Sequence, residues 1–180
     1  MRWPRGRRQR RTWQCASCGA THSGLASVFG ATYPDAFLEA SPEVLARSEA
    51  NADTAVLDAD EGPRYFVRGH VVIPVDDAEM PQFVWSVWVE LSEEAIDEVG
   101  QRWDRKDRAT LPPVPARLDA PSLPYEPPIV GLRALLRDRE PGTVPLVLLD
   151  ESQEHPLVEE QRDGITIHRV ADLNTRLLAG

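Results

Sequence analysis

Hydrophobic and polar residues alternate along two long segments of the chain, and this period of two predicts half-buried β-strands. In residues 82–91, QFVWSVWVEL, one face of an extended chain carries five large apolar side chains: Phe83, Trp85, Val87, Val89 and Leu91. Residues 65–75 alternate in the same way, with Arg68 and His70 on one face. Residues 54–58 precede them across a Gly-Pro turn, so we expect a hairpin here.

Further segments are predicted to be extended although they lack a long alternation. Residues 129–138 and 144–150 are β-rich runs around a turn, and residues 165–168, ITIH, predict a last short strand. Residues 111–128 contain seven of the sixteen prolines. Because proline has no amide hydrogen for a strand ladder, this segment is predicted to be an extended loop on the surface.

Helix signals separate these strands. Residues 42–51 follow a serine cap and begin with proline, which predicts a helix. Ser92 predicts the cap of another helix, whose buried face carries three residues: Ile96, Val99 and Trp103. HPLVEEQRDG predicts a helix ended by Gly164, and RVADLNTRLLA predicts a C-terminal helix. The fold class is therefore α+β, with a mainly antiparallel sheet of about five to six strands, about three to four helices and a small N-terminal CxxC knuckle.

Length and composition are those of one soluble globular domain. The chain has 180 residues, of which 42% are hydrophobic and 27% are charged. No apolar run approaches the roughly 18 residues that suggest a transmembrane helix. The basic N-terminus lacks the apolar stretch of a signal peptide, so we expect no leader to be removed. Together with a cysteine pair in place of dispersed cysteines, these features predict a protein of the reducing cytoplasm without a membrane partner.

The net charge of −9 conceals an uneven distribution. Residues 1–13 contain no acid and six arginines: Arg2, Arg5, Arg7, Arg8, Arg10 and Arg11. Taking these six from the 20 Lys and Arg residues leaves 14 basic against 29 acidic groups in the remainder, a balance of −15. An acidic body argues against broad nucleic-acid binding, since phosphate contacts need clustered cations. We predict residues 1–13 to be a disordered arm, the one part suited to RNA, DNA or anionic lipid, and residues 14–180 to be a single domain.

The motif with the clearest chemistry is the cysteine pair near the N-terminus. Cys15 and Cys18 are the only cysteines, and their spacing places two thiolates within reach of one tetrahedral metal ion. Gly19 tolerates the positive φ angle that turns the backbone toward the sulfurs, and His22 is spaced to be a third ligand. We predict residues 14–24 to form a zinc knuckle.

Zinc held structurally needs four ligands, and the sequence has no second CxxC pair. His155 is the predicted fourth ligand, with His70, His168 or a carboxylate as alternatives. Three protein ligands and an open position would make the metal catalytic instead. A redox pair stays open as an interpretation, although it requires a thioredoxin-like βαβ unit that the sequence lacks. A third interpretation is that Cys15 and Cys18 are plain reduced thiols in a terminal loop.

Candidate binding side chains come from the predicted strands. Trp85 and Trp88 lie on opposite faces of residues 82–91, so one is expected in the core and the other under a helix or in a groove. Arg68 is a candidate anion contact beside His70, and an arginine near an exposed Trp88 would form a stacking platform. The ordinary alternatives are core packing for the tryptophans and a surface ion pair for Arg68. The sequence contains no dinucleotide fingerprint, phosphate loop, nucleophile elbow or HExxH motif.

Four stretches taken together resemble a bacterial family, the domain of unknown function DUF2199. In chain order they are CASCGATHSGL, YFVRGHVVIPV, FVWSVWVELSEE and HPLVEEQRDGI, and the likeness runs from about Cys15 to Val170. The resemblance implies a small bacterial domain that begins with a CxxCG…H motif, and it implies no reaction. Because the HPL…Q segment belongs to it, the resemblance adds Gln161 to the candidate binding residues.

These observations lead to three functional hypotheses. The first is a zinc-stabilised binding or interaction module with an unidentified protein or small-molecule partner. The second is an enzyme in which His70, His155 and Arg68 surround a cleft, with or without an open metal. The third is an RNA-associated protein led by its arginine arm. Converging His and Arg side chains in one cavity would favour the enzyme.

Overall fold

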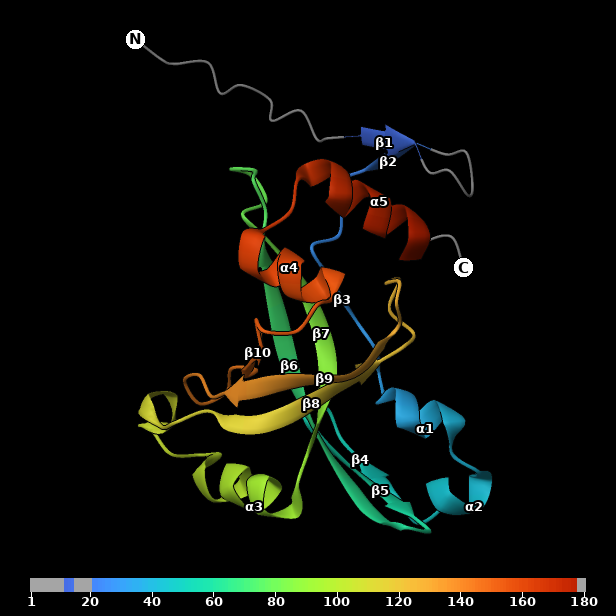
Figure 1. The fold of residues 1–180 in the computed structure, drawn as a ribbon, viewed down its shortest axis with the longest axis vertical. Coiled ribbons are helices and arrows are strands. Elements are labelled where there is room, and N and C mark those ends of the chain that lie inside the picture. The colour runs from blue at the N-terminus through green and yellow to red at the C-terminus, as the bar shows by residue number, and fades with distance from the viewer. Residues whose placement is uncertain (1–11, 15–20, 178–180) are drawn as a thin grey trace.

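The computed structural model describes residues 12–14 and 21–177. Their strands are β1 Thr12–Gln14, β2 Thr21–Ser23, β3 Val28–Gly30, β4 Glu49–Ala50, β5 Thr54–Ala59, β6 Gly62–Pro74, β7 Gln82–Leu91, β8 Val114–Ala120, β9 Ile129–Arg137 and β10 Leu146–Leu149. Their helices are α1 Asp35–Glu39, α2 Pro42–Leu45, α3 Glu93–Arg102, α4 Pro156–Asp163 and α5 Ile167–Leu177, with a 3₁₀ turn at Arg108–Thr110 (Figure 1). Among these helices none has the length and apolar character needed to span a membrane.

Strands β3 to β10 form one sheet that closes on itself. Its strand order is β3-β7-β8-β9-β10-β6-β5-β4, and β6 also pairs with β7. The strands β6 to β10 are therefore a closed ring of pairings, and β8 and β9 run across β6 and β7 in Figure 1. β6 and β7 are long, with 13 and 10 residues, so each also pairs with a strand outside the ring. The ring encloses the main core.

The α+β class is confirmed, but the predicted sheet is wrong in detail. The sheet has eight strands and is mixed, because β3 lies parallel to β7 and β10 lies parallel to β6. β3 and β4 have three and two residues, too few for an alternating pattern to be recognised. The parallel pairs join segments far apart in sequence, which no local pattern reveals. The described residues also contain five α-helices, more than predicted, because α1 has five residues and no side-chain cap to announce it.

The proline-rich segment 111–128 is predicted to be a surface loop, but part of it forms β8 between β7 and β9. Its side chains alternate, and four of them are buried: Val114, Ala116, Leu118 and Ala120. Pro115 is exposed near the start of the strand, where proline is tolerated. The period of two therefore decides the local structure, in spite of the prolines around it.

Residues 165–168 do not form the predicted strand. Ile165 makes a single parallel bridge with Val75, and α5 begins at Ile167. The Thr166 hydroxyl accepts a hydrogen bond from the Arg169 amide at 3.3 Å, which is the contact made by a helix N-cap. The short β-branched run therefore ends at a helix start.

The helix predicted over residues 42–51 begins as expected but is shorter. Ser41 Oγ accepts a hydrogen bond from the Val44 amide at 3.3 Å, and Pro42 occupies the first helical position. The following residues, Glu49–Ala50, pair with β5 as β4 instead of continuing the helix. Pairing at the edge of the sheet thus ends α2.

The predicted faces of β6 and β7 are confirmed. The large apolar residues of β7 point into the main core, where Trp85 is fully buried. Trp88 lies on the opposite face and is buried in a second cluster that includes Phe37 of α1 and Phe66 of β6. α1 and α2 cover this cluster, and each tryptophan therefore belongs to a separate core.

Candidate functional site

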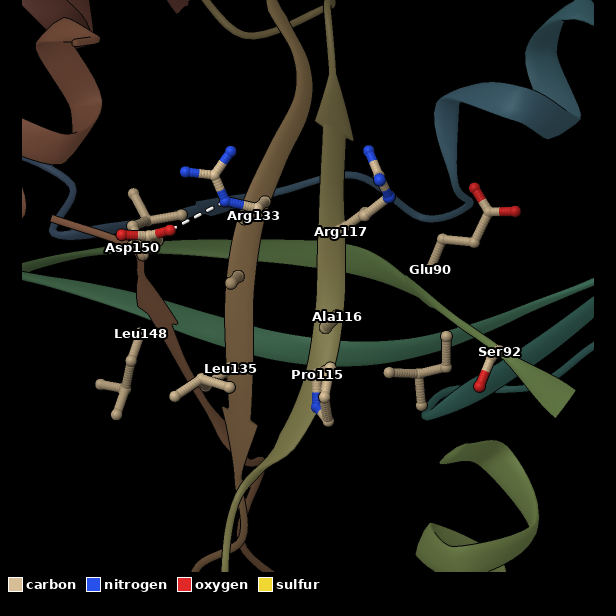
Figure 2. Close-up of a pocket in the computed structure, with 12 residues that line it drawn as sticks. Glu90, Ser92, Pro115, Ala116, Arg117, Arg133, Leu135, Leu148 and Asp150 are labelled. Atoms are coloured by element: carbon tan, nitrogen blue, oxygen red, sulfur yellow. Dashed lines mark hydrogen bonds and ion pairs between the residues drawn. The ribbon is translucent and has the colours of Figure 1, made fainter. Parts of the chain in front are cut away.

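An open groove lies on the outer face of β8, β9 and β10, next to the end of β7. Its volume is about 750 Å³, within the size range of small-molecule sites. The residues that line it are Glu90, Leu91, Ser92, Pro115, Ala116, Arg117, Arg133, Ala134, Leu135, Leu148, Leu149 and Asp150. Figure 2 shows the charged side chains at one end of this groove and the apolar ones at the other.

The apolar end of the groove is formed by adjacent strands. Pro115 of β8, Leu135 of β9 and Leu148 of β10 lie side by side in Figure 2. Leu135 is 42% exposed, although the residues before and after it in β9 are buried. Exposed apolar side chains on a paired sheet form a rigid surface that is ready to receive the apolar part of a ligand.

On one side of the charged end, Arg133 and Asp150 form an ion pair. The Arg133 Nε lies 2.8 Å from Asp150 Oδ2. Hydrogen bonds from the hydroxyl and amide of Ser152, and then the bond from Arg133, lower the pKa of Asp150 to about 2. Asp150 is therefore ionised at neutral pH and compensates the charge of Arg133.

On the other side of the charged end, Glu90 is also bound, but its neighbour Arg117 is not. Arg64 of β6 donates to both carboxylate oxygens of Glu90, at 2.8 and 2.6 Å. The Glu90 carboxylate raises the pKa of Arg64. Arg117 lies opposite Glu90 in the β7–β8 ladder and is exposed. Within the part of the chain that the structure describes, no side chain or backbone group forms a hydrogen bond or ion pair with the Arg117 side chain.

Two predicted binding residues, His70 and Gln161, line a second cavity of about 370 Å³ between β6 and β10. β10 pairs with β6 only where Leu146 lies opposite His70. Beyond that point the Gln161 side-chain amide donates to the Val147 carbonyl and accepts from the Leu149 amide, both at 2.8 Å. Gln161 therefore satisfies the open edge of β10, which is a structural role.

His70 is half-buried beside this second cavity. Burial lowers its pKa, and the positive charges of Arg139 and Arg68 lower it further. The imidazole is therefore neutral at neutral pH. It has no carboxylate partner of the kind that orients a catalytic histidine among the interactions that the described residues show.

The predicted pair of Arg68 and Trp88 does come together, but not as an exposed platform. The Arg68 guanidinium carbon lies 4.8 Å from the centroid of the Trp88 ring. Trp88 is only 4% exposed, and its Nε1 donates to the Ala31 carbonyl at 3.3 Å. Arg68 Nη2 donates to the Thr32 carbonyl at 3.3 Å. The pair thus fixes the segment before α1 onto the sheet.

His155 caps α4 and is buried. Its Nδ1 accepts a hydrogen bond from the Leu157 amide at 3.1 Å. In a neutral ring Nε2 then carries the hydrogen and donates to the Pro127 carbonyl at 3.0 Å. Both ring nitrogens are engaged, so a metal-ligand role for His155 requires one of these bonds to break. That role stays a prediction.

The ring of His155 packs against Tyr125, which is the centre of a buried chain of hydrogen bonds. Trp85 Nε1 donates to the Tyr125 hydroxyl at 2.9 Å, and this hydroxyl donates to Glu160 at 2.6 Å. Glu160 also binds Arg169 at 2.7 Å. Burial, followed by the Glu160 charge, raises the pKa of Tyr125. The chain of bonds ties β7 to α4 and α5.

Cys15 and Cys18 lie outside the described residues, as do residues 1–11 of the predicted arm. β1 and β2 pair in antiparallel fashion on either side of the cysteines, with Trp13 opposite His22. Residues 24–177, whose side chains the structure describes, contain no group of three or more His, Cys, Asp or Glu side chains placed to hold a metal. The zinc knuckle therefore stays a prediction.

The segment that follows β2 is held to the C-terminal helix by Asn174. This side chain is fully buried in α5. Its Oδ1 accepts from the Ala26 amide at 2.9 Å, and its Nδ2 donates to the Ala26 carbonyl at 3.0 Å. A second Nδ2 bond reaches the Val170 carbonyl at 2.9 Å. The chain is thus fixed to the domain a few residues after the predicted knuckle.

The groove residues Arg117, Arg133 and Leu135 are absent from the sequence-based candidates. A usable signal lies in VPARLDA, where small and apolar residues at every second position place Arg117 on an outer face. The segment IVGLRALLR places Arg133 and Leu135 on one face in the same way. Their meeting in one groove depends on the pairing of β8 with β9 and β10, which the sequence does not reveal.

The structure is an α+β domain with a closed ring of strands and an open groove on the outer face of β8, β9 and β10. The chain belongs to the family described as an uncharacterized protein conserved in bacteria (DUF2199), whose model matches residues 14–165. The resemblance drawn from the four sequence stretches is thereby confirmed. No curated protein and no solved structure matches the chain.

Proposed function

We propose that the protein is a bacterial cytoplasmic binding module that holds a small molecule in the groove of β8, β9 and β10. The observation that carries this proposal is the groove of about 750 Å³, with exposed Pro115 and Leu135 and half-buried Leu148 at one end and charged residues at the other. An apolar wall with a few polar groups in fixed positions is typical of small-molecule sites.

The state of the charged groups supports binding rather than acid–base catalysis. A general base works best when its pKa lies near the operating pH, and the pKa of Asp150 is about 2. Glu90 has both oxygens bound by Arg64. The residues of the enzyme hypothesis are dispersed, since His70 lines another cavity and His155 caps α4.

The groove is tested by mapping small amphipathic probes on the full chain with amide chemical shifts in NMR. We expect shifts to cluster on β8, β9 and β10, and we expect Leu135→Asp to remove them because a charge then occupies the apolar end. Val130→Asp is the matched control, since Val130 lies on the same strand, is 68% exposed and does not line the groove. Shifts that persist in Leu135→Asp, or that map to another surface, contradict the proposal.

Zinc is the proposed structural cofactor of the N-terminal segment. Cys15 directly follows β1, and Cys18 and Gly19 precede β2, so the cysteines lie in the connection between two paired strands. The spacing of the two cysteines suits two thiolates on one metal. The Asn174 contact with Ala26 supports the proposal further, because it gives the segment a fixed attachment to the domain.

Metal analysis of the purified chain tests this cofactor. We expect about one zinc per chain, and its loss in Cys15→Ser together with a lower melting temperature, because structural zinc contributes directly to folding. His168→Gln is the control, since His168 is exposed on α5. His155→Gln decides whether that residue is the fourth ligand. Metal-free protein whose melting temperature does not change in Cys15→Ser rules out the zinc knuckle.

A further inference from the structure

The charged side chains that line the groove differ in whether they are paired, and this difference indicates a class of ligand. Arg133 is paired with Asp150, and Glu90 is paired with Arg64. Arg117 is left as a groove cation that no described residue binds. Its guanidinium lies near the neighbouring strand β9, since a Cβ at Gly131 would meet Arg117 Nη1 at an ordinary contact distance of 3.7 Å. An arginine of this kind offers planar N–H donors to a carboxylate.

The apolar end begins on the same strand as this cation and extends away from it. Pro115 lies two positions before Arg117 in β8, and Leu135 and Leu148 continue the apolar row across β9 and β10 (Figure 2). Two strand spacings amount to about 10 Å, which is close to the length of a medium-chain acyl group. The groove therefore has one cationic end and one apolar body.

A peptide fits this surface less well than a small molecule does. The groove floor is the face of a sheet in which β8, β9 and β10 pair with one another. Gln161 occupies the remaining edge groups of Val147 and Leu149, and Pro115 has no amide hydrogen to donate. A bound peptide would find few backbone partners here, whereas a small acid has only one polar end to satisfy.

We infer that the groove binds a small amphipathic monocarboxylate, with the carboxylate on Arg117 and the apolar chain over Pro115, Leu135 and Leu148. This inference rests on the proposed function, because it names the ligand class of the same groove. Because the protein has a net charge of −9, an anion is attracted only where a cation of the protein is locally uncompensated. This adds to the selectivity of the groove for a carboxylate at Arg117.

The test titrates the full chain with octanoate, octanamide and octylamine, which share an apolar chain and differ in the polar end. We expect octanoate to shift the groove amides at the lowest concentration, and we expect Arg117→Gln to weaken octanoate binding about tenfold through loss of the charge-assisted hydrogen bonds. Arg137→Gln is the matched control, because Arg137 is an exposed arginine at the end of β9 and does not line the groove. Arg117→Lys keeps the charge and should retain part of the affinity.

The outcomes separate this inference from the proposed function. Equal binding of octanoate and octanamide, or unchanged octanoate binding in Arg117→Gln, overturns the carboxylate assignment and leaves the groove as a small-molecule site. Preference for octylamine overturns it as well. If none of the three compounds shifts the groove amides, the proposed function fails together with the inference. Equal weakening in Arg137→Gln shows that the effect is general electrostatics and also overturns the role of Arg117.

Discussion

Replacing Arg108 by alanine is expected to lower the free energy of unfolding by about 3–5 kcal/mol, the range for removing one partner of a buried charged network. Arg108 is 1% exposed, and its guanidinium lies over the ring of Trp103. It donates to four backbone carbonyls at 2.6, 2.7, 2.8 and 3.3 Å: Arg139, Trp103, Thr143 and Glu140. The variant leaves all four oxygens without this donor, and a buried unsatisfied group costs about 1–3 kcal/mol.

The position of these carbonyls explains why so large an effect is expected. One belongs to the end of α3, and the others belong to the connection between β9 and β10. Arg108 therefore joins two loops that border the ring of strands. Its charge also acts on the neighbouring Asp138. Burial raises the pKa of Asp138, and the positive charges of Arg102 and Arg108 offset part of this rise.

Urea unfolding followed by circular dichroism measures the effect of Arg108. Arg108→Met should resemble Arg108→Ala, because it keeps much of the length but has no donors. Arg108→Lys should be intermediate, because a single ammonium cannot reach carbonyls on several sides. Arg105→Ala is the control, since Arg105 is exposed and paired with Asp107 on the surface, where such pairs contribute about 0–1 kcal/mol. A change in Arg108→Ala no larger than in Arg105→Ala contradicts the expectation.

Much of the fold was predictable, because the long strands carry a pattern that their burial requires. In β6 and β7, alternate residues face two different cores, and their apolar side chains reveal this directly. α3 and α4 were predictable for another reason, since Ser92 caps the first and Gly164, with a φ of +80°, ends the second. Each of these signals is local in sequence.

The closure of the sheet was not predictable in this way. The β10–β6 pairing depends on one register contact, Leu146 opposite His70, and β7 meets β8 at two. β8 itself was hidden by the prolines around Val114–Ala120. Composition favoured a loop there, whereas burial of every second side chain favoured a strand, and burial decided the structure.

In the candidate site, too, residues with a local sequence signal were predictable, and residues that meet only through strand pairing were not. The predicted candidates are polar or aromatic residues in clear elements. Arg68, Trp88, His155 and Gln161 have structural partners, whereas His70 lines the second cavity. The groove residues became visible only after β8, β9 and β10 were placed beside one another. Function on a sheet face depends on cross-strand neighbours, and single-strand patterns do not contain that information.

Replacing Gly69 by alanine is expected to lower the free energy of unfolding by about 1–3 kcal/mol, because it overpacks the core. Gly69 lies in β6 on the face that meets β9 and β10. A Cβ there would overlap Val147 Cγ2 and would lie 3.2 Å from Leu136 Cδ1, and both of these residues are fully buried. Val147 is β-branched and restricted in χ1, so it has little freedom to move away.

Gly100→Ala is the matched control for Gly69→Ala. Gly100 is exposed in α3, and a Cβ there meets no atom within 4 Å. Alanine is the better helix former, so this variant is expected to gain about 0.5–1 kcal/mol. The same substitution should thus have opposite signs at the two positions. A gain in stability for Gly69→Ala contradicts the close approach of β6 to β10.

A double-mutant cycle tests whether Val147 causes the loss. Val147→Ala alone should destabilise the protein, because it leaves a cavity inside the ring of strands. In the double variant Gly69→Ala/Val147→Ala, the new methyl group occupies part of the space that Val147 vacates. We therefore expect the combined loss to be smaller than the sum of the single losses by about 0.5–3 kcal/mol, as found for residues in contact. Strict additivity would mean that the two side chains do not meet, and the crossing of β10 over Gly69 would then have to be abandoned.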